Sequence, residues 1–396
     1  MAGPLAGVRI LDLTRLYPGP YATLLLCDFG ADVVKLEDAS EGDPLRALPA
    51  QFEALNRGKR SIAVDLKAPE GASLLRRLCA RADVLVEGFR PGVLARLGCA
   101  PEALLAEFPR LIVCSLSGFG QTGPLRDRAG HDIGYVAASG VLSRCGLGDV
   151  PALPGAQIAD FLGGGLQAVI AVLAAIVERA TTGRGRLLDV AMCEGAMQAL
   201  FPRLGDPSSE DVLRGDRPCY RVYACHGGGA IALGALEPKF WHRFCAAVSR
   251  SEWEGRQFDA SLCTAVDELF LEKTRDEWAA LLGPVDCCAE PVLTLDEVRA
   301  HPHHRARSLW LSDGRPRTVP ALLGTAEIPG ARAPFHGEHS ERSDPGAGAA
   351  DARGHTRHDS LSSSPKKPKA TDSVRAHDDL AGAHSRPPVV TSFENG

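Results

Sequence analysis

Short apolar runs alternate with helical segments in the N-terminal part of the chain, and this alternation constrains the fold more than any other feature. A strand, a helix and a second strand within about thirty residues require parallel pairing and a right-handed crossover. Because the runs are almost continuously Val, Ile and Leu, both faces of the sheet must be covered. We therefore predict an α/β fold with a Rossmann-like, doubly wound parallel sheet. The predicted strands are Val8–Leu13, Ala31–Glu37, Ser61–Leu66, Asp83–Glu87, Leu111–Leu116 and Arg186–Met192, and the predicted helices include Tyr21–Phe29, Pro69–Ala82 and Ala100–Phe108.

The loops at the strand ends carry the polar residues that such a sheet presents to a ligand. Pro18-Gly19-Pro20 follows the first strand in place of G-x-G-x-x-G, which argues against a dinucleotide site. Arg57, Lys59 and Arg60 precede the third strand. This cationic loop either meets phosphate groups or is solvated, and the spacing does not decide between the two.

The stretch from Gly130 to Gly165 contains the best candidates for acid–base chemistry. It opens with His131 and closes with Asp160, and an apolar helix follows over Leu162–Val177. An imidazole and a carboxylate on two sides of one pocket form a plausible acid–base pair. The glycines after Asp160 are expected to let another molecule come close.

A change of composition divides the rest of the chain. We expect a large α/β domain over residues 1–205, a linker over 206–219, and a smaller α+β domain over 220–310 that opens with a β-hairpin. A segment over 311–340 returns to the large domain. Residues 341–396 have too few large apolar side chains to offset the entropy of ordering, so this tail is expected to be disordered.

Composition excludes several classes of protein. The net charge of −5 gives no basic field for nucleic acid. The apolar run Leu162–Val177 falls short of the ~20 residues that span a bilayer, so we expect a buried helix and no membrane span. The twelve cysteines lack metal-site spacing. With no secretory signal and no peroxisomal C-terminal tripeptide, a cytoplasmic location is expected.

Several motifs, taken in order, resemble the α-methylacyl-CoA racemase branch of the family III CoA-transferase superfamily. The similarity runs from near residue 5 to about residue 340. The motifs are Gly19-Pro20 with Asp28–Lys35, Asn56–Ser61, Gly88–Val93, Leu116–Pro124, Ala129–Ile133, Ala159–Phe161, Gly234–Phe240 and Pro291–Leu293.

This resemblance implies an interlocked homodimer, an acyl-CoA substrate, and no cofactor or metal beyond the CoA of the substrate. His131 and Asp160 correspond to the two catalytic acid/base groups, Glu237 to a glutamate that hydrogen-bonds the histidine, and Asp132 to its neighbour in the Gly-His-Asp motif. The positions that correspond to CoA-binding residues are Lys59, Ile62, Ala63, Val64, Asp65, Arg90, Gly130, Ile133, Gly134 and Tyr135.

The activity that follows is interconversion of (2R)- and (2S)-2-methylacyl-CoA thioesters by 1,1-proton transfer through an enolate. Two alternatives stay open: a CoA-transferase in which Asp160 is the nucleophile, and a non-catalytic CoA-binding protein. The chain also departs from the racemase pattern, because Asp38 stands where racemases tend to carry an arginine for CoA phosphate. Arg46 or Arg57 is a candidate to replace that cation.

Overall fold

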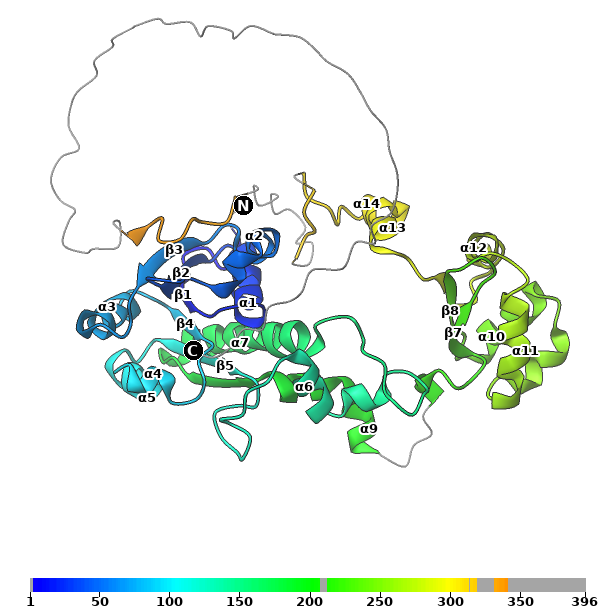
Figure 1. Ribbon diagram of the computed structural model, residues 1–396, viewed down its shortest axis with the longest axis horizontal. Helices are drawn as coiled ribbons and strands as arrows, with labels where there is room; N and C mark the ends of the chain where they lie inside the picture. Colours follow the sequence, from blue (N-terminus) through cyan, green and yellow to red (C-terminus); the bar gives the residue numbers. More distant parts are fainter. Residues whose placement is uncertain (1–2, 207–211, 313, 319–330, 341–396) are drawn as a thin grey trace, which may run out of the picture. The chain divides into compact units, whose positions relative to one another are not determined.

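The computed structural model describes residues 3–206, 212–312, 314–318 and 331–340 (Figure 1). Backbone contacts divide the chain into Met1–Pro345 and Gly346–Gly396. All described residues belong to the first unit. The tail that the sequence predicts to be disordered, residues 341–396, lies outside the described residues.

Six parallel strands form the main sheet, as the sequence predicts. Their order is β3-β2-β1-β4-β5-β6, and every pair is parallel. This is the order of a doubly wound Rossmann-like sheet. The strands are β1 (Arg9–Leu13), β2 (Asp32–Asp38), β3 (Arg60–Val64), β4 (Val84–Glu87), β5 (Ile112–Ser117) and β6 (Leu187–Ala191).

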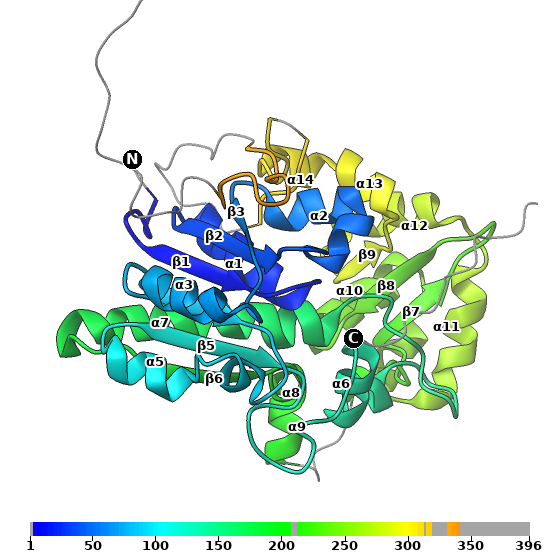
Figure 2. The same ribbon diagram turned by 60° about the vertical axis from the view of Figure 1, so that its left-hand side comes forward.

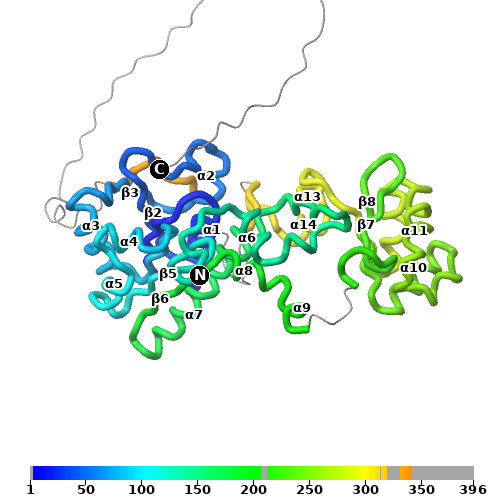
Figure 3. The backbone as a smooth tube through the Cα atoms, turned by 60° about the horizontal axis from the view of Figure 1, so that its bottom comes forward, coloured from blue at the N-terminus to red at the C-terminus, as the bar shows by residue number. Residues whose placement is uncertain are grey.

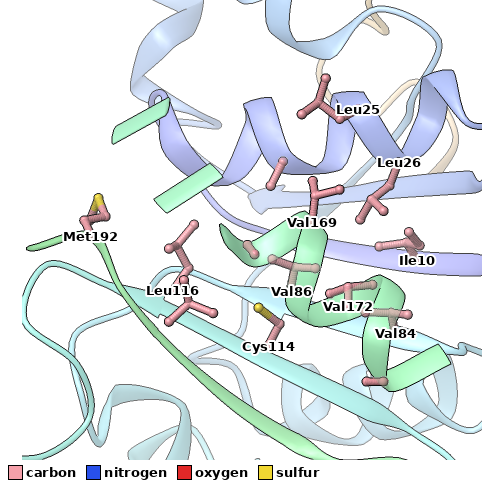
Figure 4. Close-up of a cluster of buried hydrophobic side chains, with 14 of the residues drawn as sticks. Ile10, Leu25, Leu26, Val84, Val86, Cys114, Leu116, Val169, Val172 and Met192 are labelled. Atoms are coloured by element: carbon pink, nitrogen blue, oxygen red, sulfur yellow. The ribbon is translucent and has the colours of Figure 1, made fainter. Parts of the chain in front are cut away.

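Alternate residues of the strands bury two separate hydrophobic clusters. Ile10, Val84 and Ile112 belong to one cluster, whereas the residues that follow them face the other. Helices therefore cover both faces, which is why the strands read as continuous apolar runs. Figure 4 shows side chains of α1 (Pro18–Asp28) and α7 (Gln167–Thr182) on the first face. The other face packs against α3 (Pro69–Cys79), α4 (Val93–Arg96) and α5 (Pro101–Glu107).

Proline marks where several helices begin. The helices α1, α3, α5 and α2 (Pro49–Asn56) each have proline in their first turn, where its missing N–H costs nothing. Helix α2 was not among the helices predicted from the sequence. The shorter helices of this part are α6 (Asp132–Ala138), α8 (Met192–Met197) and α9 (Phe201–Gly205), with 3-10 turns at η1 (Pro44–Ala47), η2 (Val141–Arg144) and η4 (Gln198–Leu200).

The apolar helix begins with a π-helical segment, η3 (Ile158–Leu166), which continues into α7. Its glycines do not admit a ligand, so that prediction was wrong. A Cβ on Gly163 would lie 2.5 Å from a backbone oxygen of α8, and one on Gly165 would lie 2.7 Å from Tyr21. The glycines instead let η3 pack against α8 and α1. Ile158–Thr182 is long and apolar enough to cross a membrane by length and composition, but its inner face is buried against the sheet.

A second, antiparallel sheet has its own core. The hairpin of β7 (Tyr220–Ala224) and β8 (Ala230–Gly234) forms as predicted, and β9 (Ala289–Pro291) adds a third strand that the sequence did not reveal. Figure 3 traces this sheet with α10 (Pro238–Ala247) and α11 (Cys263–Phe270). The remaining elements are η5 (Val212–Arg214), η6 (Ser251–Arg256), η7 (Ala260–Leu262), α12 (Arg275–Leu282), η8 (Gly283–Val285), α13 (Leu295–Ala300) and α14 (Pro302–Ala306).

Residues 331–340 return to the main sheet and cover the edge of β3 (Figure 2). The backbone N–H of His339 donates to the carbonyl of Ser61 (2.9 Å), and the N–H of Ala63 donates to Ser340 Oγ (3.1 Å). The edge strand therefore has hydrogen-bond partners from a segment far away in the sequence, which protects it from pairing with another chain.

Candidate functional site

The strand order reverses between β1 and β4, and ligands of such sheets bind where the loops diverge at the carboxyl ends of the strands. Leu13 at the end of β1 lies beside Glu87 at the end of β4. The turn Thr14–Tyr17 follows the first strand, and Gly88–Arg90 follows the second. These two loops and the loop after β5 therefore surround the expected ligand crevice.

A cavity of about 440 Å³ lies at this edge and contains both predicted acid–base groups. His131 comes from the start of α6 and Asp160 from the first turn of η3. A volume of this size accommodates a small ligand. The cavity is lined by Tyr17, His131, Asp132, Ile133, Val136, Leu153, Pro154, Gly155, Ala156, Gln157 and Asp160.

The environment of Asp160 favours its protonated form. Burial raises the pKa of this carboxyl to about 6, and the negative charge of Asp132 adds to the shift. Asp132 also holds the backbone in place, because its Oδ1 accepts a hydrogen bond from the N–H of Asp160 (2.8 Å). A carboxyl with a pKa near 6 can both donate and accept a proton near neutral pH. Asp132 thus acts on Asp160 through position and charge.

Tyr135 shapes the loop that carries His131. Its hydroxyl donates to the carbonyl of Gly130 (2.7 Å), and a Cβ on Gly118 or Gly130 would lie within 2.6 Å of its ring. Within the chain the phenol and this carbonyl are hydrogen-bonded to each other, and the assignment of Tyr135 and Gly130 as CoA contacts stays a prediction. The imidazole of His131 is exposed and makes no hydrogen bond with any residue that the structure describes.

Two of the three cations in the loop before β3, Arg57 and Lys59, are buried in ion pairs and do not face a ligand. Lys59 is buried, and its Nζ lies within 3.1 Å of four oxygen acceptors, among them Asp12 Oδ2. Burial lowers the pKa of Lys59 to about 8 despite the adjacent carboxylate. Arg57 forms a bidentate pair with Asp28. Arg57 and Lys59 therefore form ion pairs in the interior of the protein, and all N–H donors of Lys59 already have acceptors there.

Arg60, Arg46 and Asp38 have local partners as well. Arg60 pairs with Asp32, and Arg46 pairs with Glu37 (2.6 Å). Neither Arg46 nor Arg57 is therefore free to replace the expected phosphate-binding arginine. The carboxylate of Asp38 accepts hydrogen bonds from Ser40 and Glu41, and these bonds lower its pKa.

The predicted CoA-binding strand Ile62–Asp65 contributes little free surface. Ile62 and Val64 are buried in the cluster on the sheet face that α3, α4 and α5 cover, so their side chains cannot contact a ligand. The backbone of Ala63 is hydrogen-bonded to the returning segment. Asp65 is exposed and accepts a hydrogen bond from the N–H of Lys67.

Three other predicted CoA contacts are accessible. Ile133 lines the cavity and is 50% exposed, and Gly134 has open space where a Cβ would stand. Arg90, at the carboxyl end of β4, is exposed, and its side chain has no ion pair or hydrogen bond with the described residues. Its positive charge acts on the phenol of Tyr135, whose pKa burial raises to about 12. Arg90 is thus the predicted cation that remains available to a phosphate.

Glu237 precedes α10 as its N-cap residue and is exposed. It does not line the cavity of this chain. Tyr17, Leu153 and Gln157 do line it and were not predicted from the sequence. The signal for Tyr17 was its position, directly after the first strand of a doubly wound sheet.

No metal centre is evident in the described part of the chain. No group of three or more His, Cys, Asp or Glu side chains is arranged there to hold an ion. The rings of His301 and His304 lie 4.7 Å apart, and His304 Nδ1 lies 3.0 Å from the carbonyl of Val298. His301 thus connects α13 to α14, and His304 lies within α14.

Comparison with known proteins shows the family of this chain. The sequence profile of CoA-transferase family III matches residues 5–349. The chain belongs to CoA-transferase family III. Human alpha-methylacyl-CoA racemase is 40% identical over 357 residues, which cover 85% of this chain and 91% of the relative. Human succinyl-CoA:glutarate CoA-transferase is 39% identical over 358 residues, covering 83% and 79%.

Solved structures of the family have the same fold. The crystal structure of a CAIB/BAIF family protein from Brucella suis matches with a TM-score of 0.75 at 30% identity, covering 86% of this chain and 98% of that chain. Because a racemase and a CoA-transferase are both about 40% identical to this chain, identity alone does not fix the reaction type, which has to be argued from the cavity.

Proposed function

We propose that this family III protein is a racemase that interconverts (2R)- and (2S)-2-methylacyl-CoA thioesters. The observation that carries the proposal is the presence of His131 and Asp160 in one cavity. Racemisation removes a proton from one face of the α-carbon and adds a proton to the other, so it needs two acid–base groups. The raised pKa of Asp160 suits a carboxyl that must change protonation state in every cycle.

The proton count balances over one turnover. One of the two groups takes the α-proton, and the electrons of the C–H bond move into the thioester to form an enolate. The other group then delivers its proton to the opposite face of the same carbon. In the reverse direction, His131 and Asp160 exchange roles, so each must be stable in both protonation states.

The enolate oxygen needs a hydrogen-bond donor. The first backbone N–H groups of a helix have no intrahelical acceptor, and α6 begins at Asp132 beside the cavity. We assign the N–H groups of Asp132 and Ile133 to this role. A single donor of this kind typically contributes about 3 kcal/mol to the stabilisation of the transition state.

Arg90 is our candidate for a CoA phosphate contact, with Ile133 and Gly134 beside the thioester arm. We propose that the reaction requires no cofactor beyond the CoA of the substrate, since proton transfer between two side chains completes it, and that the enzyme acts in the cytoplasm.

We also propose that the enzyme works as a homodimer. The outer face of η3 and α7 presents Leu162, Ile170 and Val177 at helical spacing, and they are 53%, 59% and 70% exposed. An apolar stripe of this kind on a central helix favours burial by a partner. A second copy of the chain would also supply Glu237 to the imidazole of His131. Sedimentation velocity of the wild-type protein and a Val177→Asp variant tests the dimer, which the charged variant should weaken.

The second candidate is a CoA-transferase in which Asp160 attacks the thioester to form a mixed anhydride. The 39% identity to a human CoA-transferase is the reason to consider it. His131 argues for the racemase, because anhydride formation does not need an imidazole on the opposite side of the substrate.

The deciding experiment incubates a single (2R)-2-methylacyl-CoA in deuterated water. A racemase inverts the α-carbon, incorporates deuterium there and needs no acceptor acid. Strict dependence on an acceptor acid would show a transferase, and CoA binding with neither reaction would show a binding protein.

A further inference from the structure

Tyr17 is the one aromatic residue among those that line the cavity. It enters from the turn after β1, whereas Ile133 and Val136 enter from α6 and Leu153 from the loop before η3. Its ring makes an edge contact with Phe161, at 6.0 Å between ring centroids. Since Phe161 follows Asp160 in η3, Tyr17 packs against the element that carries Asp160.

The turn that carries Tyr17 adopts a costly backbone conformation. Leu16 has φ = 64°, a left-handed value that is uncommon for residues with a Cβ. Such conformations persist where the surroundings enforce them, and they concentrate at functional sites. Gly19, in the first turn of α1, packs closely against this turn, because a Cβ there would lie 2.2 Å from the side chain of Thr14.

A buried ionic network enforces this turn. The N–H of Leu16 donates to Asp43 Oδ1 (3.1 Å), and Asp43 pairs with Lys35 at 2.8 Å, both side chains being 0% exposed. The same Lys35 Nζ donates to the carbonyl of Thr14 (2.8 Å). The carbonyl of Thr14 and the N–H of Leu16 are thus both hydrogen-bonded to one buried lysine–aspartate pair. The proposed proton transfer does not use this pair.

The side chain of Tyr17 is fixed as well. Its hydroxyl donates to Gln51 Oε1 in α2, and its ring packs against the buried cluster of Leu24, Leu45, Phe52, Leu55 and Ala333. Leu153, by contrast, lies in an irregular loop and is 62% exposed. Compared with Leu153, Tyr17 is held both by the hydrogen bonds of its turn and by the packing of its ring, and side chains on rigid elements discriminate between ligands better than side chains on loops.

We propose that Tyr17 determines the acyl specificity of the site, by limiting the size of the group bonded to the α-carbon on the Asp160 side and selecting compact 2-methylacyl groups over bulky ones. The proposal rests on the function proposed above, since the α-carbon must lie between His131 and Asp160 for the ring to contact its substituents. The hydroxyl of Tyr17, bound to Gln51, is not part of this selection.

The test compares a compact and a bulky ligand. Nonreactive thioethers, S-(2-methylbutyl)-CoA and S-(2-phenylpropyl)-CoA, are titrated calorimetrically into wild type, Tyr17→Ala and Tyr17→Phe. Tyr17→Ala should shift the ratio of the two dissociation constants at least about tenfold towards the bulky ligand, the size of discrimination that a few carbons in an apolar pocket provide. Tyr17→Phe should keep the wild-type ratio.

An unchanged ratio in Tyr17→Ala would overturn the proposal, as would an equal shift in Tyr17→Phe. Tyr17→Leu carries the same prediction as Tyr17→Ala if the alanine variant does not fold. Because the thioethers do not react, their binding ratio decides the role of Tyr17 whatever the reaction. Deuterium uptake from 2-methylbutanoyl-CoA by the wild-type enzyme separately decides the proposed function.

Discussion

Replacing Asp160 by asparagine should stabilise the fold at high pH while it abolishes inversion and the α-proton exchange of the enantiomer whose α-proton faces Asp160. The carboxyl has a pKa of about 6 in the folded chain against 3.8 without its surroundings, because burial and the charge of Asp132 oppose ionisation. The folded state therefore binds the proton more tightly. Between these two values stability falls as the pH rises, and the penalty is complete once the folded carboxyl has ionised.

The magnitude follows from the pKa difference. At about 1.36 kcal/mol per unit, ionised Asp160 costs the fold about 3 kcal/mol at pH 8 and about 1.6 kcal/mol at pH 5. The stability of Asp160→Asn relative to wild type should therefore increase by roughly 1.4 kcal/mol from pH 5 to pH 8. Urea denaturation at both pH values measures it, with Asp149→Asn, an exposed carboxylate outside the cavity lining, as the matched control.

A relative stability of Asp160→Asn that stays constant or decreases between pH 5 and pH 8 would refute the reasoning. It would mean that the carboxyl ionises as easily in the cavity as in the unfolded chain. The claim that Asp160 is poised for proton transfer would then lose its physical basis.

Further predictions concern groups outside the acid–base pair. Lys59→Met should destabilise the fold by about 3–5 kcal/mol in urea denaturation, because it leaves a buried carboxylate unpaired, and wild-type stability would contradict the ion pair. Arg90→Ala should weaken CoA binding about tenfold or more in calorimetry, as expected for loss of a charged hydrogen bond. Arg60→Ala is its control, and equal losses in the two variants would argue against a phosphate contact. Gly195→Ala should lower the thermal unfolding midpoint, since its Cβ would meet Gly163 O at 1.8 Å; an unchanged midpoint would mean that α8 can shift.

The sheet could be predicted from the sequence because a strand that is buried on both faces appears as a continuous run of apolar residues. Ile10 and Leu11 point to opposite clusters, so adjacent residues of a strand must both be apolar. Helix α2 has a weaker apolar pattern in the sequence, because only Phe52 and Leu55 provide its main apolar contacts with the core.

The cationic loop shows where sequence reasoning fails. Lys59 and Asp12 are 47 residues apart in the chain, and spacing along the sequence cannot show that they meet. A buried lysine with a carboxylate partner and an exposed lysine that awaits a phosphate look the same in a sequence. For the same reason the sequence could not show that the glycines of η3 serve helix packing. Nor could it show that Tyr17 lines the cavity, because this depends on the strained turn at Leu16.

The central claim is that His131 and Asp160 act on opposite faces of one α-carbon. The most direct measurement follows α-deuterium uptake by each enantiomer of a 2-methylacyl-CoA separately, in deuterated water, with the His131→Ala variant. The account predicts that inversion is lost while one enantiomer, the one whose α-proton faces Asp160, still exchanges. Retention of inversion in this variant, or equal exchange of both enantiomers, would contradict the two-sided mechanism.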